Sequence, residues 1–211
     1  MNKQEIKQKW EKALALTKTY TPDKFKFYGM NEKVSISSAE ASEGTVVKGE
    51  IIVEQCKARE YMDVICATDM PTRLKLDPKT KAFSELDTFE DGDGRWSIRY
   101  YLVASPSMMV SDRDFLYCER EFQEGNKLTL LTTSIDGSYT CDKASGVRGT
   151  NIFTLYELVE LENGDLRVTF MGQANPNGWI PTAVANQVVY ERPLVVSAAA
   201  KILNKNIKSV Q

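Results

Sequence analysis

The sequence predicts an α+β protein in which one helix is followed by a long antiparallel sheet and then by a long C-terminal helix. Apolar residues recur at helical spacing in residues 2–18 and again from Pro181 onward. The region between them is rich in β-branched and aromatic stretches, most of which follow one another without an intervening helix. Consecutive strands joined by short turns favour antiparallel pairing, so we expect one curved sheet.

The first half of the chain carries fewer strands. The predicted helix at residues 2–18 ends before Pro22, since proline does not continue a helix that is already formed. Strand-like stretches follow at residues 24–38 and 45–54, and the second is rich in valine and isoleucine. Residues 57–70 show a helical pattern, and a mixed segment with two prolines comes after them.

The second half is predicted to hold most of the sheet. Its strands are expected at residues 96–104, 114–122, 127–135, 147–161 and 165–174. Gly125-Asn126 and Asn163-Gly164 supply residues typical of turns between them. Pro181 suits the first position of the last helix, and Pro193 is expected to kink or break that helix near Arg192.

Length and composition indicate a globular chain. The protein has 211 residues, of which 42% are hydrophobic and 27% charged, close to the average of folded domains. We expect a single domain over residues 1–211, although the length also allows two small ones. A net charge of -2 argues against a nucleic-acid partner held by bulk positive charge.

The missing histidine is the most restrictive feature of the composition. Without histidine, Ser-His-Asp and Cys-His catalysis and His-ligated zinc are excluded. The cysteines form no C-x-x-C pair, and we expect no metal and no cofactor. The charged N-terminus does not resemble a signal peptide, and no run of residues suits a membrane span, so we expect a cytoplasmic protein. From Arg192 to Gln211 the chain is basic, which fits either a solvated helix face or an anionic surface.

Three motifs occur in order along the second half of the chain. Residues 97–122 contain a strand, a proline-containing loop and the sequence S-x-R-D-F. Residues 145–149 read SGVRG and residues 178–187 read GWIPTAVANQ. In this order and at these separations they resemble the START domain, the lipid-transfer module of the StAR-related family. Arg113 and Asp114 are interpreted as fold-defining residues that begin a strand.

The resemblance implies a helix-grip fold. In this fold a curved antiparallel sheet wraps around a long C-terminal helix and encloses a tunnel for one lipid. Alternate residues of two strands, Tyr101, Val103, Phe115 and Tyr117, are candidates for the tunnel wall, although they also fit an ordinary packed core.

Arg73 and Asp77 form a candidate phosphate site. Their i, i+4 spacing places both on one side of a helical turn. They resemble the arginine that contacts phosphate, and the aspartate that pairs with it, in phosphatidylcholine-transfer members. Leu76 stands where those members commonly have tryptophan. A surface ion pair is the alternative interpretation.

The resemblance also implies an aromatic cage for choline. Alignment on Pro106 places Tyr101 and Phe115 at two cage positions and the third near Ile152, which has no aromatic ring. The acid–arginine pair of the sterol-carrying branch would fall near Tyr100 and Glu119, and the sequence shows no such pair there. The sequence GWIP at residues 178–181 is more similar to the sterol-carrying branch, whereas the headgroup residues favour a phospholipid.

A loop and the start of the last helix are expected to form a lid. Met108, Met109 and Val110 are consecutive apolar residues in a loop, so they either pack against the C-terminal helix or enter a membrane. Trp179 fits either an interfacial anchor or a buried residue that caps the sheet. Val188, on the last helix, completes the predicted lid and membrane contact.

These features predict a monomeric carrier that binds one lipid, most simply a phospholipid such as phosphatidylcholine, and exchanges it at a membrane surface without being an enzyme. A sterol or ceramide carrier of the same fold is one alternative. A helix-grip enzyme that uses carboxylates, tyrosine or lysine is a second, and a regulatory module with a ligand-binding pocket is a third.

Overall fold

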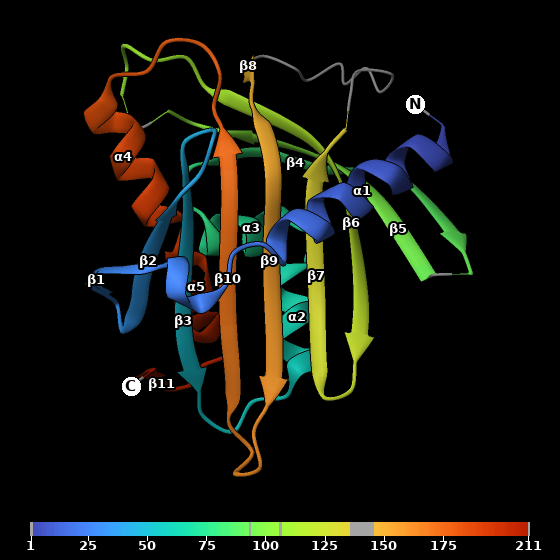
Figure 1. The fold of residues 1–211 in the computed structure, drawn as a ribbon, viewed down its shortest axis with the longest axis vertical. Coiled ribbons are helices and arrows are strands. Elements are labelled where there is room, and N and C mark those ends of the chain that lie inside the picture. The colour runs from blue at the N-terminus through green and yellow to red at the C-terminus, as the bar shows by residue number, and fades with distance from the viewer. Residues whose placement is uncertain (1, 93, 106, 136–145, 211) are drawn as a thin grey trace.

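The computed structural model describes residues 2–92, 94–105, 107–135 and 146–210 (Figure 1). Pro106 and Ser145 of the motifs, and the cysteine at position 141, Cys141, lie outside the described residues. The helices are α1 (Lys3–Thr17), α2 (Ala58–Ile65), α3 (Met70–Leu76), α4 (Thr182–Glu191) and α5 (Val195–Ile202), with 3-10 turns η1 (Pro22–Lys24) and η2 (Arg192–Leu194). The strands are β1 (Lys26–Asn31), β2 (Val34–Glu40), β3 (Thr45–Val53), β4 (Thr80–Asp91), β5 (Gly94–Val103), β6 (Arg113–Glu124), β7 (Lys127–Ser134), β8 (Val147–Arg148), β9 (Thr150–Glu160), β10 (Leu166–Asn175) and β11 (Ile207–Ser209).

The expected antiparallel sheet is confirmed. Its described strands lie in the order β1-β2-β3-β10-β9-β7-β6-β5-β4, and each neighbouring pair is antiparallel. The short strand β11 pairs with β3, and β8 runs parallel to β6. Helix α1 crosses one face of the sheet, while α2, α3 and α5 lie on the other face (Figure 1). The sheet therefore curves around the C-terminal helical segment.

Three parts of the first half differ from the prediction. Residues 24–38 form two strands rather than one stretch, because Glu32 and Lys33 turn the chain with positive φ angles of 48° and 64°. The predicted helix at residues 57–70 is two helices, and the side chain of Asp69 caps the second by accepting a hydrogen bond from the Thr72 amide at 2.9 Å. Strand β4 was not predicted. It is an edge strand with two register shifts and several exposed acidic residues, so it lacks a regular alternation.

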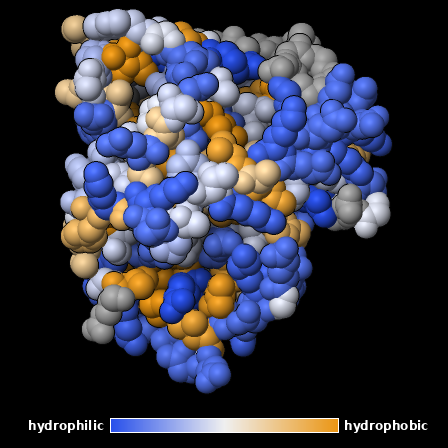
Figure 2. Space-filling model, viewed as in Figure 1, coloured by the Kyte–Doolittle hydropathy of each residue, from blue (hydrophilic) through white to orange (hydrophobic). Residues whose placement is uncertain are grey.

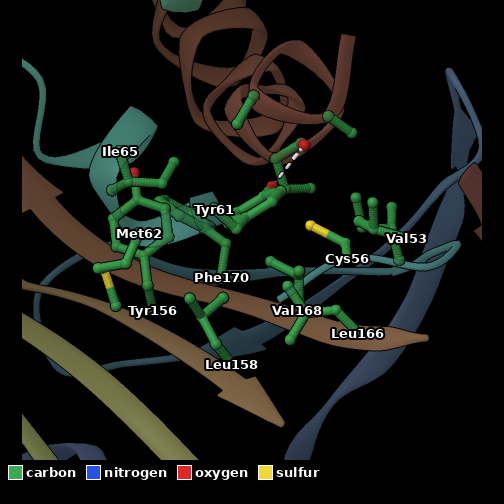
Figure 3. Packing of buried hydrophobic residues seen from close by; sticks show 14 of the residues in the cluster. Val53, Cys56, Tyr61, Met62, Ile65, Tyr156, Leu158, Leu166, Val168 and Phe170 are labelled. Carbon is green, nitrogen blue, oxygen red and sulfur yellow. Dashed lines mark hydrogen bonds between the residues drawn. The ribbon is translucent and has the colours of Figure 1, made fainter. Parts of the chain in front are cut away.

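A buried apolar cluster joins α2 and α5 to the sheet (Figure 3). Tyr61 of α2 is fully buried in it and donates a hydrogen bond from its hydroxyl to the Val196 carbonyl at 2.6 Å. Met62 and the rings of Tyr156 and Phe170 surround Tyr61 in the same view. This bond satisfies a buried hydroxyl and fixes α5 relative to α2.

Helix α1 packs on the opposite face of the sheet through Trp10. The Trp10 ring meets Trp96 edge-on at 5.4 Å and Phe122 at 5.5 Å between ring centroids, and its indole nitrogen donates to the Leu131 carbonyl at 3.0 Å. Ile6 and Ala13 are buried on the same side of the helix. The predicted N-terminal helix is thus confirmed, and its apolar side covers the convex face of the sheet.

The C-terminal helical run is interrupted at Pro193, as predicted. Helix α4 ends at Glu191, the 3-10 turn η2 contains the proline, and α5 begins at Val195. Pro193 has no amide hydrogen to donate inside a helix, so a tighter turn replaces one turn of α-helix. The proline ring packs directly on Gly49 of β3, at a position where a side chain would collide with it.

Gly49→Ala is expected to lower the free energy of unfolding by about 1–3 kcal/mol, because the added methyl group overpacks the contact with Pro193. Gly29→Ala is the matched control, since no atom lies within 4 Å of its added methyl group. Urea denaturation measures both variants. Equal midpoints for the two variants would contradict the assigned role of Gly49.

Candidate functional site

Alternate residues of two central strands share the concave face of the sheet. Residue Tyr101 lies opposite Phe115 across the β5–β6 pair, and Arg99 lies opposite Tyr117. The concave row consists of Arg99, Tyr101 and Val103 from β5 and Phe115, Tyr117 and Glu119 from β6. The structure therefore brings together the four predicted wall residues. Their role in binding a ligand stays a prediction.

The four predicted wall residues of the concave row are less buried than the residues between them. Tyr100, Leu102, Leu116 and Cys118 are buried on the convex side, whereas Tyr101, Val103, Phe115 and Tyr117 are only half-buried. Burial nevertheless raises the pKa of Tyr101 and of Tyr117, so protein atoms surround both hydroxyls. These side chains are enclosed without being closely packed, which is what a ligand site requires.

A buried ion pair lies on the same face. The Arg99 guanidinium contacts a Glu119 carboxylate oxygen at 2.9 Å through Nε and 2.7 Å through Nη2, and its Nη1 lies 2.9 Å from Glu85. Burial raises the pKa of Glu119, and Arg99 opposes that rise. The sequence interpretation that no acid–arginine pair exists near Tyr100 and Glu119 is wrong, because the arginine stands one residue before Tyr100.

Arg73 and Asp77 do not form the expected pair. Helix α3 ends at Leu76, and Asp77 is its C-cap, with φ -142° and ψ 105°. The Asp77 amide still donates to the Arg73 carbonyl at 2.8 Å, but the carboxylate does not pair with the Arg73 guanidinium. Asp77 instead accepts hydrogen bonds from the Tyr101 hydroxyl and from the Lys79 amide, the latter at 2.9 Å. Arg73 donates to the Ala67 carbonyl, and its guanidinium lies 3.8 Å from the centre of the Phe83 ring.

Two of the three predicted cage residues meet, and the third does not join them. The rings of Tyr101 and Phe115 stack with centroids 6.5 Å apart. Ile152 packs with the apolar cluster of Trp10 instead, as does the fully buried Phe153. The position was predicted by alignment on Pro106, and a register shift between β9 and β10 falls at this point of β9.

Phe83, Tyr156 and Arg192 are interior residues that the sequence did not single out. Phe83 lies opposite Tyr101 on the unpredicted strand β4, and its ring centroid is 6.0 Å from that of Tyr101. Tyr156 lies on β9, where burial raises the pKa of its hydroxyl to about 12. The alternating pattern of β9 could have identified Tyr156 from the sequence. No pattern indicated Phe83, because strand β4 was not predicted.

Arg113 and Asp114 hold the end of the sheet to the segment before α4. Arg113 donates to the carbonyl of Pro176 at 2.7 Å and to that of Asn177 at 3.0 Å. Asp114 accepts two hydrogen bonds from Arg148, at 3.1 and 2.9 Å. Both side chains are engaged by protein groups, which supports the fold-defining interpretation.

Apolar side chains are exposed at the end of the molecule that holds α4 and the β5–β6 loop. Met108 is 106% exposed, Met109 79% and Trp179 72%, whereas Val110 is buried and Val188 is just exposed at 36%. The interpretation of Trp179 as a buried cap is wrong. Hydrophobic residues reach the surface over α4 at the upper left of Figure 2. The predicted lid and membrane contact thus presents apolar side chains to the surroundings.

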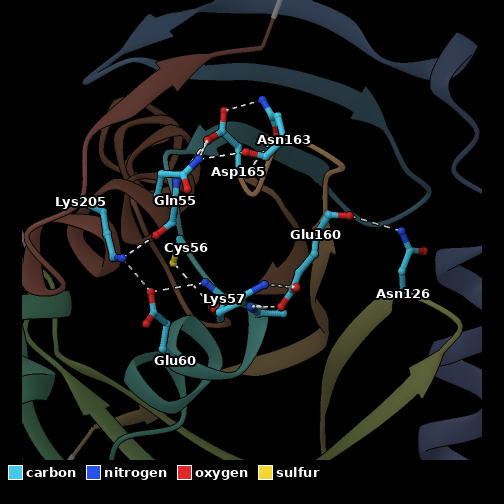
Figure 4. Close-up of polar contacts among 10 residues, drawn as sticks. Gln55, Cys56, Lys57, Glu60, Asn126, Glu160, Asn163, Asp165 and Lys205 are labelled. Carbon is cyan, nitrogen blue, oxygen red and sulfur yellow. Dashed lines mark hydrogen bonds and ion pairs between the residues drawn. The ribbon is translucent and has the colours of Figure 1, made fainter.

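A polar network closes the opposite end of the sheet (Figure 4). Asp165 accepts a hydrogen bond from the Gln55 amide at 3.1 Å, and Glu160 accepts one from the Ala58 amide at 2.9 Å and pairs with Lys57 at 3.1 Å. A surface hollow of about 280 Å³ lies beside this network and contains none of the predicted ligand residues. Access to the concave face is therefore favoured at the lid end.

The structure offers no metal centre among its described residues, where no cluster of three or more His, Cys, Asp or Glu side chains is suited to holding an ion. No helix in the described ranges is both long and apolar enough to cross a bilayer. Cys56, Cys66 and Cys118 are free thiols, and burial raises the pKa of Cys56 and Cys118 to about 12. These thiols are therefore protonated and poorly nucleophilic at neutral pH.

Comparison with known families identifies the fold. A family model described as START domain matches residues 22–209. The chain belongs to the START domain family. The expected helix-grip fold is confirmed by the curved antiparallel sheet and the C-terminal helix that this START domain shares with solved members of the family. None of the curated proteins matches the chain by sequence.

Solved structures of related lipid-transfer proteins share this fold. Human StAR-related lipid transfer protein 5 superposes with a TM-score of 0.79 at 18% identity, over 96% of this chain and 100% of that chain. Human STARD10 gives 0.73 at 16% identity, over 95% of this chain and 79% of that chain. A fragment of a STAR-related lipid transfer protein from Xanthomonas axonopodis gives 0.70 at 20% identity, over 86% and 99%. At these identities the likeness establishes the fold.

Arg99→Met is expected to lower the free energy of unfolding by about 3–5 kcal/mol at neutral pH, because it leaves Glu119 charged and buried without its partner. The pKa of Glu119 is already raised above 4.5 and rises further in the variant. A carboxyl with a raised folded pKa stabilises the folded state below its unfolded pKa and loses that contribution as pH rises. The deficit should therefore shrink toward acidic pH.

Denaturation of Arg99→Met between neutral and mildly acidic pH measures this effect. Arg95→Met is the control, since Arg95 also pairs with Glu85 but is exposed, and it should cost under about 1 kcal/mol. A deficit for Arg99→Met that is the same at every pH would argue against Glu119 as its source.

Proposed function

We propose that this START domain is a monomeric cytoplasmic carrier that binds one lipid against the concave face of its sheet and exchanges it at a membrane surface without covalent chemistry. The observation that carries the proposal is that Tyr101, Val103, Phe115 and Tyr117 of the concave row are only half-buried, while the residues of both neighbouring clusters are buried. The free thiols agree with a reducing compartment. Two similar structures are named lipid transfer proteins, which supports the same class of ligand.

The affinity for such a ligand comes mainly from its tails. Burial of one methylene group is worth about 0.8 kcal/mol, so a pair of acyl chains outweighs any headgroup contact. The apolar members of the concave row, Val103 and Phe115, suit the tails. The polar interior groups then select among lipids rather than hold them.

We further propose that the lipid is a phospholipid and that Arg73 contacts its phosphate. Arg73 has no carboxylate partner among the described residues, and its guanidinium is stacked on Phe83 next to Tyr101. A guanidinium with free donors binds a phosphate through a bidentate pair of hydrogen bonds. Asp77, held by Tyr101 and Lys79, positions the base of the site rather than pairing with Arg73.

Arg73→Met is expected to lower phospholipid transfer between vesicles about 10- to 100-fold, because a charge-assisted hydrogen bond is worth about 1.5–3 kcal/mol. Lys75→Met is the matched control, since Lys75 is exposed on the same helix. Fluorescence transfer between labelled donor and unlabelled acceptor vesicles gives the rate. Unchanged transfer by a folded Arg73→Met protein would remove Arg73 from the phosphate site.

The apolar end of the molecule supplies the route for exchange. Met108, Met109 and Trp179 are exposed beside α4, so they contact a bilayer without refolding. Methionine adapts to irregular apolar surroundings, and tryptophan favours the membrane interface. Insertion of this end brings the open side of the sheet against the lipid layer.

Met108→Asp combined with Met109→Asp is expected to slow exchange at least tenfold while lipid already bound stays bound, because two carboxylates oppose entry into the bilayer. Met30→Asp is the control. Met30 is also an exposed methionine, but it lies on the edge strand β1 next to the turn that points away from the lid end. Equal slowing by the control would show a general charge effect instead of a specific membrane contact.

A sterol carrier is the second candidate, favoured by one observation. The buried Arg99–Glu119 pair offers polar partners for a single hydroxyl on an otherwise apolar ligand. Native mass spectrometry of the protein after incubation with mixed vesicles separates the two candidates. A phospholipid adduct supports the Arg73 site, and a sterol adduct assigns the headgroup role to Arg99 and Glu119 instead.

A further inference from the structure

Arg192 is an interior cation whose position the fold fixes closely. It begins η2, and its side chain reaches across the concave face to β9 and β10. Its Nη2 donates to the Thr154 hydroxyl at 3.1 Å, and its guanidinium lies 5.7 Å from the centre of the Phe170 ring. The same nitrogen stands 2.9 Å from the place that a Cβ on Gly172 would occupy. The absent side chain at Gly172 thus makes room for the guanidinium.

The charge of Arg192 is uncompensated. Throughout the described ranges no carboxylate pairs with it, and Thr154 is a neutral partner. Burial lowers the pKa of Arg192, and the hydroxyls of Tyr156 and Tyr101 oppose this only in part. Two other interior arginines differ, because Arg99 has two carboxylates and Arg113 has backbone carbonyls on its guanidinium.

Arg73 adds a second such cation on the same side of the sheet. The Phe170 ring that Arg192 faces lies 5.4 Å from the Tyr156 ring between centroids, and both Arg73 and Arg192 lower the pKa of Tyr156. Glu119, the nearby acid, is already neutralised by Arg99. The interior near Tyr156 therefore holds two positive charges that no side chain in the described part of the chain balances.

A protein gains nothing in stability from a desolvated cation without a counter-charge, since taking an ion out of water is costly. An anionic oxygen group would supply the missing partner through charge-assisted hydrogen bonds. The interior thus favours a headgroup that is negative overall.

We propose that Arg192 binds the anionic oxygen group of the lipid and that the preferred ligand is an acidic amphiphile, with a phosphate monoester or a carboxylate as its headgroup. This inference rests on the proposed carrier function and specifies its ligand class. Arg73 and Arg192 hold the anionic group from α3 and from η2, and Tyr156 lies beside both. Arg192 is thereby a ligand-binding residue rather than part of a basic surface.

The test measures extraction of labelled lipid from phosphatidylcholine vesicles that contain a small fraction of one probe. Dioleoyl phosphatidic acid is compared with dioleoylglycerol, which has the same tails and no phosphate, and oleic acid is compared with oleyl alcohol. The wild-type protein should extract the acidic member of at least one pair at least tenfold better. The pair that shows the preference identifies phosphate or carboxylate.

Arg192→Met should reduce that preference about tenfold or more while leaving extraction of the neutral probes unchanged. The melting temperature of the ligand-free variant should equal or exceed that of the wild type, because a desolvated charge has been removed. Arg167→Met is the matched control, since Arg167 is exposed on β10, and it should leave the preference unchanged. Gly172→Ala displaces the guanidinium of Arg192 but keeps its charge, so it should lower the preference to a smaller extent. It replaces Arg192→Met as the test variant if Arg192→Met does not fold.

Several outcomes overturn the inference. Equal extraction of acidic and neutral probes by the wild type contradicts the ligand class but leaves the carrier function standing. Arg192 is a structural residue if the preference for the acidic probe survives in both Arg192→Met and Gly172→Ala. The same conclusion follows if Arg192→Met has a lower melting temperature while its preference is intact. Extraction of no probe at all by the wild type overturns the carrier function together with the inference.

Discussion

The close contact between the C-terminal helical run and two glycines of the sheet determines most of the arrangement. Pro193 packs on Gly49 of β3, and the Arg192 side chain passes over Gly172 of β10. Because a side chain at either glycine would occupy this space, the two glycines allow η2 to lie directly on β3 and β10. The break at Pro193 then lets α5 enter the core beneath Tyr61 while α4 extends toward the lid end. Core, lid and interior cation all depend on this one contact.

The two faces of the sheet serve different purposes. On the convex face, Trp10 and its aromatic neighbours fill the space under α1, where Trp10 and Trp96 are buried and Phe122 is half-buried. On the concave face of β5 and β6 the alternate residues are enclosed but only half-buried. Stability is thus concentrated in α1, α2 and α5, which leaves the concave row free to be shaped for a ligand rather than for close packing.

The sequence predicted the parts that follow a simple period and missed those that depend on where an element ends. Strict alternation placed Tyr101 and Phe115 on one face, and the structure agrees. The pairing of Asp77 with Arg73 was wrong, because α3 stops one residue before Asp77 and its carboxylate bonds to other groups. Ile152 was placed by alignment with the family's cage positions, and it packs with the Trp10 cluster instead. Arg192 appeared only as one charge of a basic tail, since its burial depends on a helix break and a distant glycine that no local pattern reveals.

The interior charges bear on how a carrier of this kind would release its ligand. An empty site would leave Arg73 and Arg192 without a counter-charge and the rings of the concave row without tails against them. Both are costly, the first by desolvation and the second by lost apolar contact. Departure of the lipid into water adds the cost of exposing its own tails. Replacement of one lipid by another at a membrane avoids all three costs, because the site and both lipids stay covered throughout. On the proposed function, the exposed apolar end beside α4 is therefore required for exchange, since it is where the concave face and the bilayer form a single apolar surface.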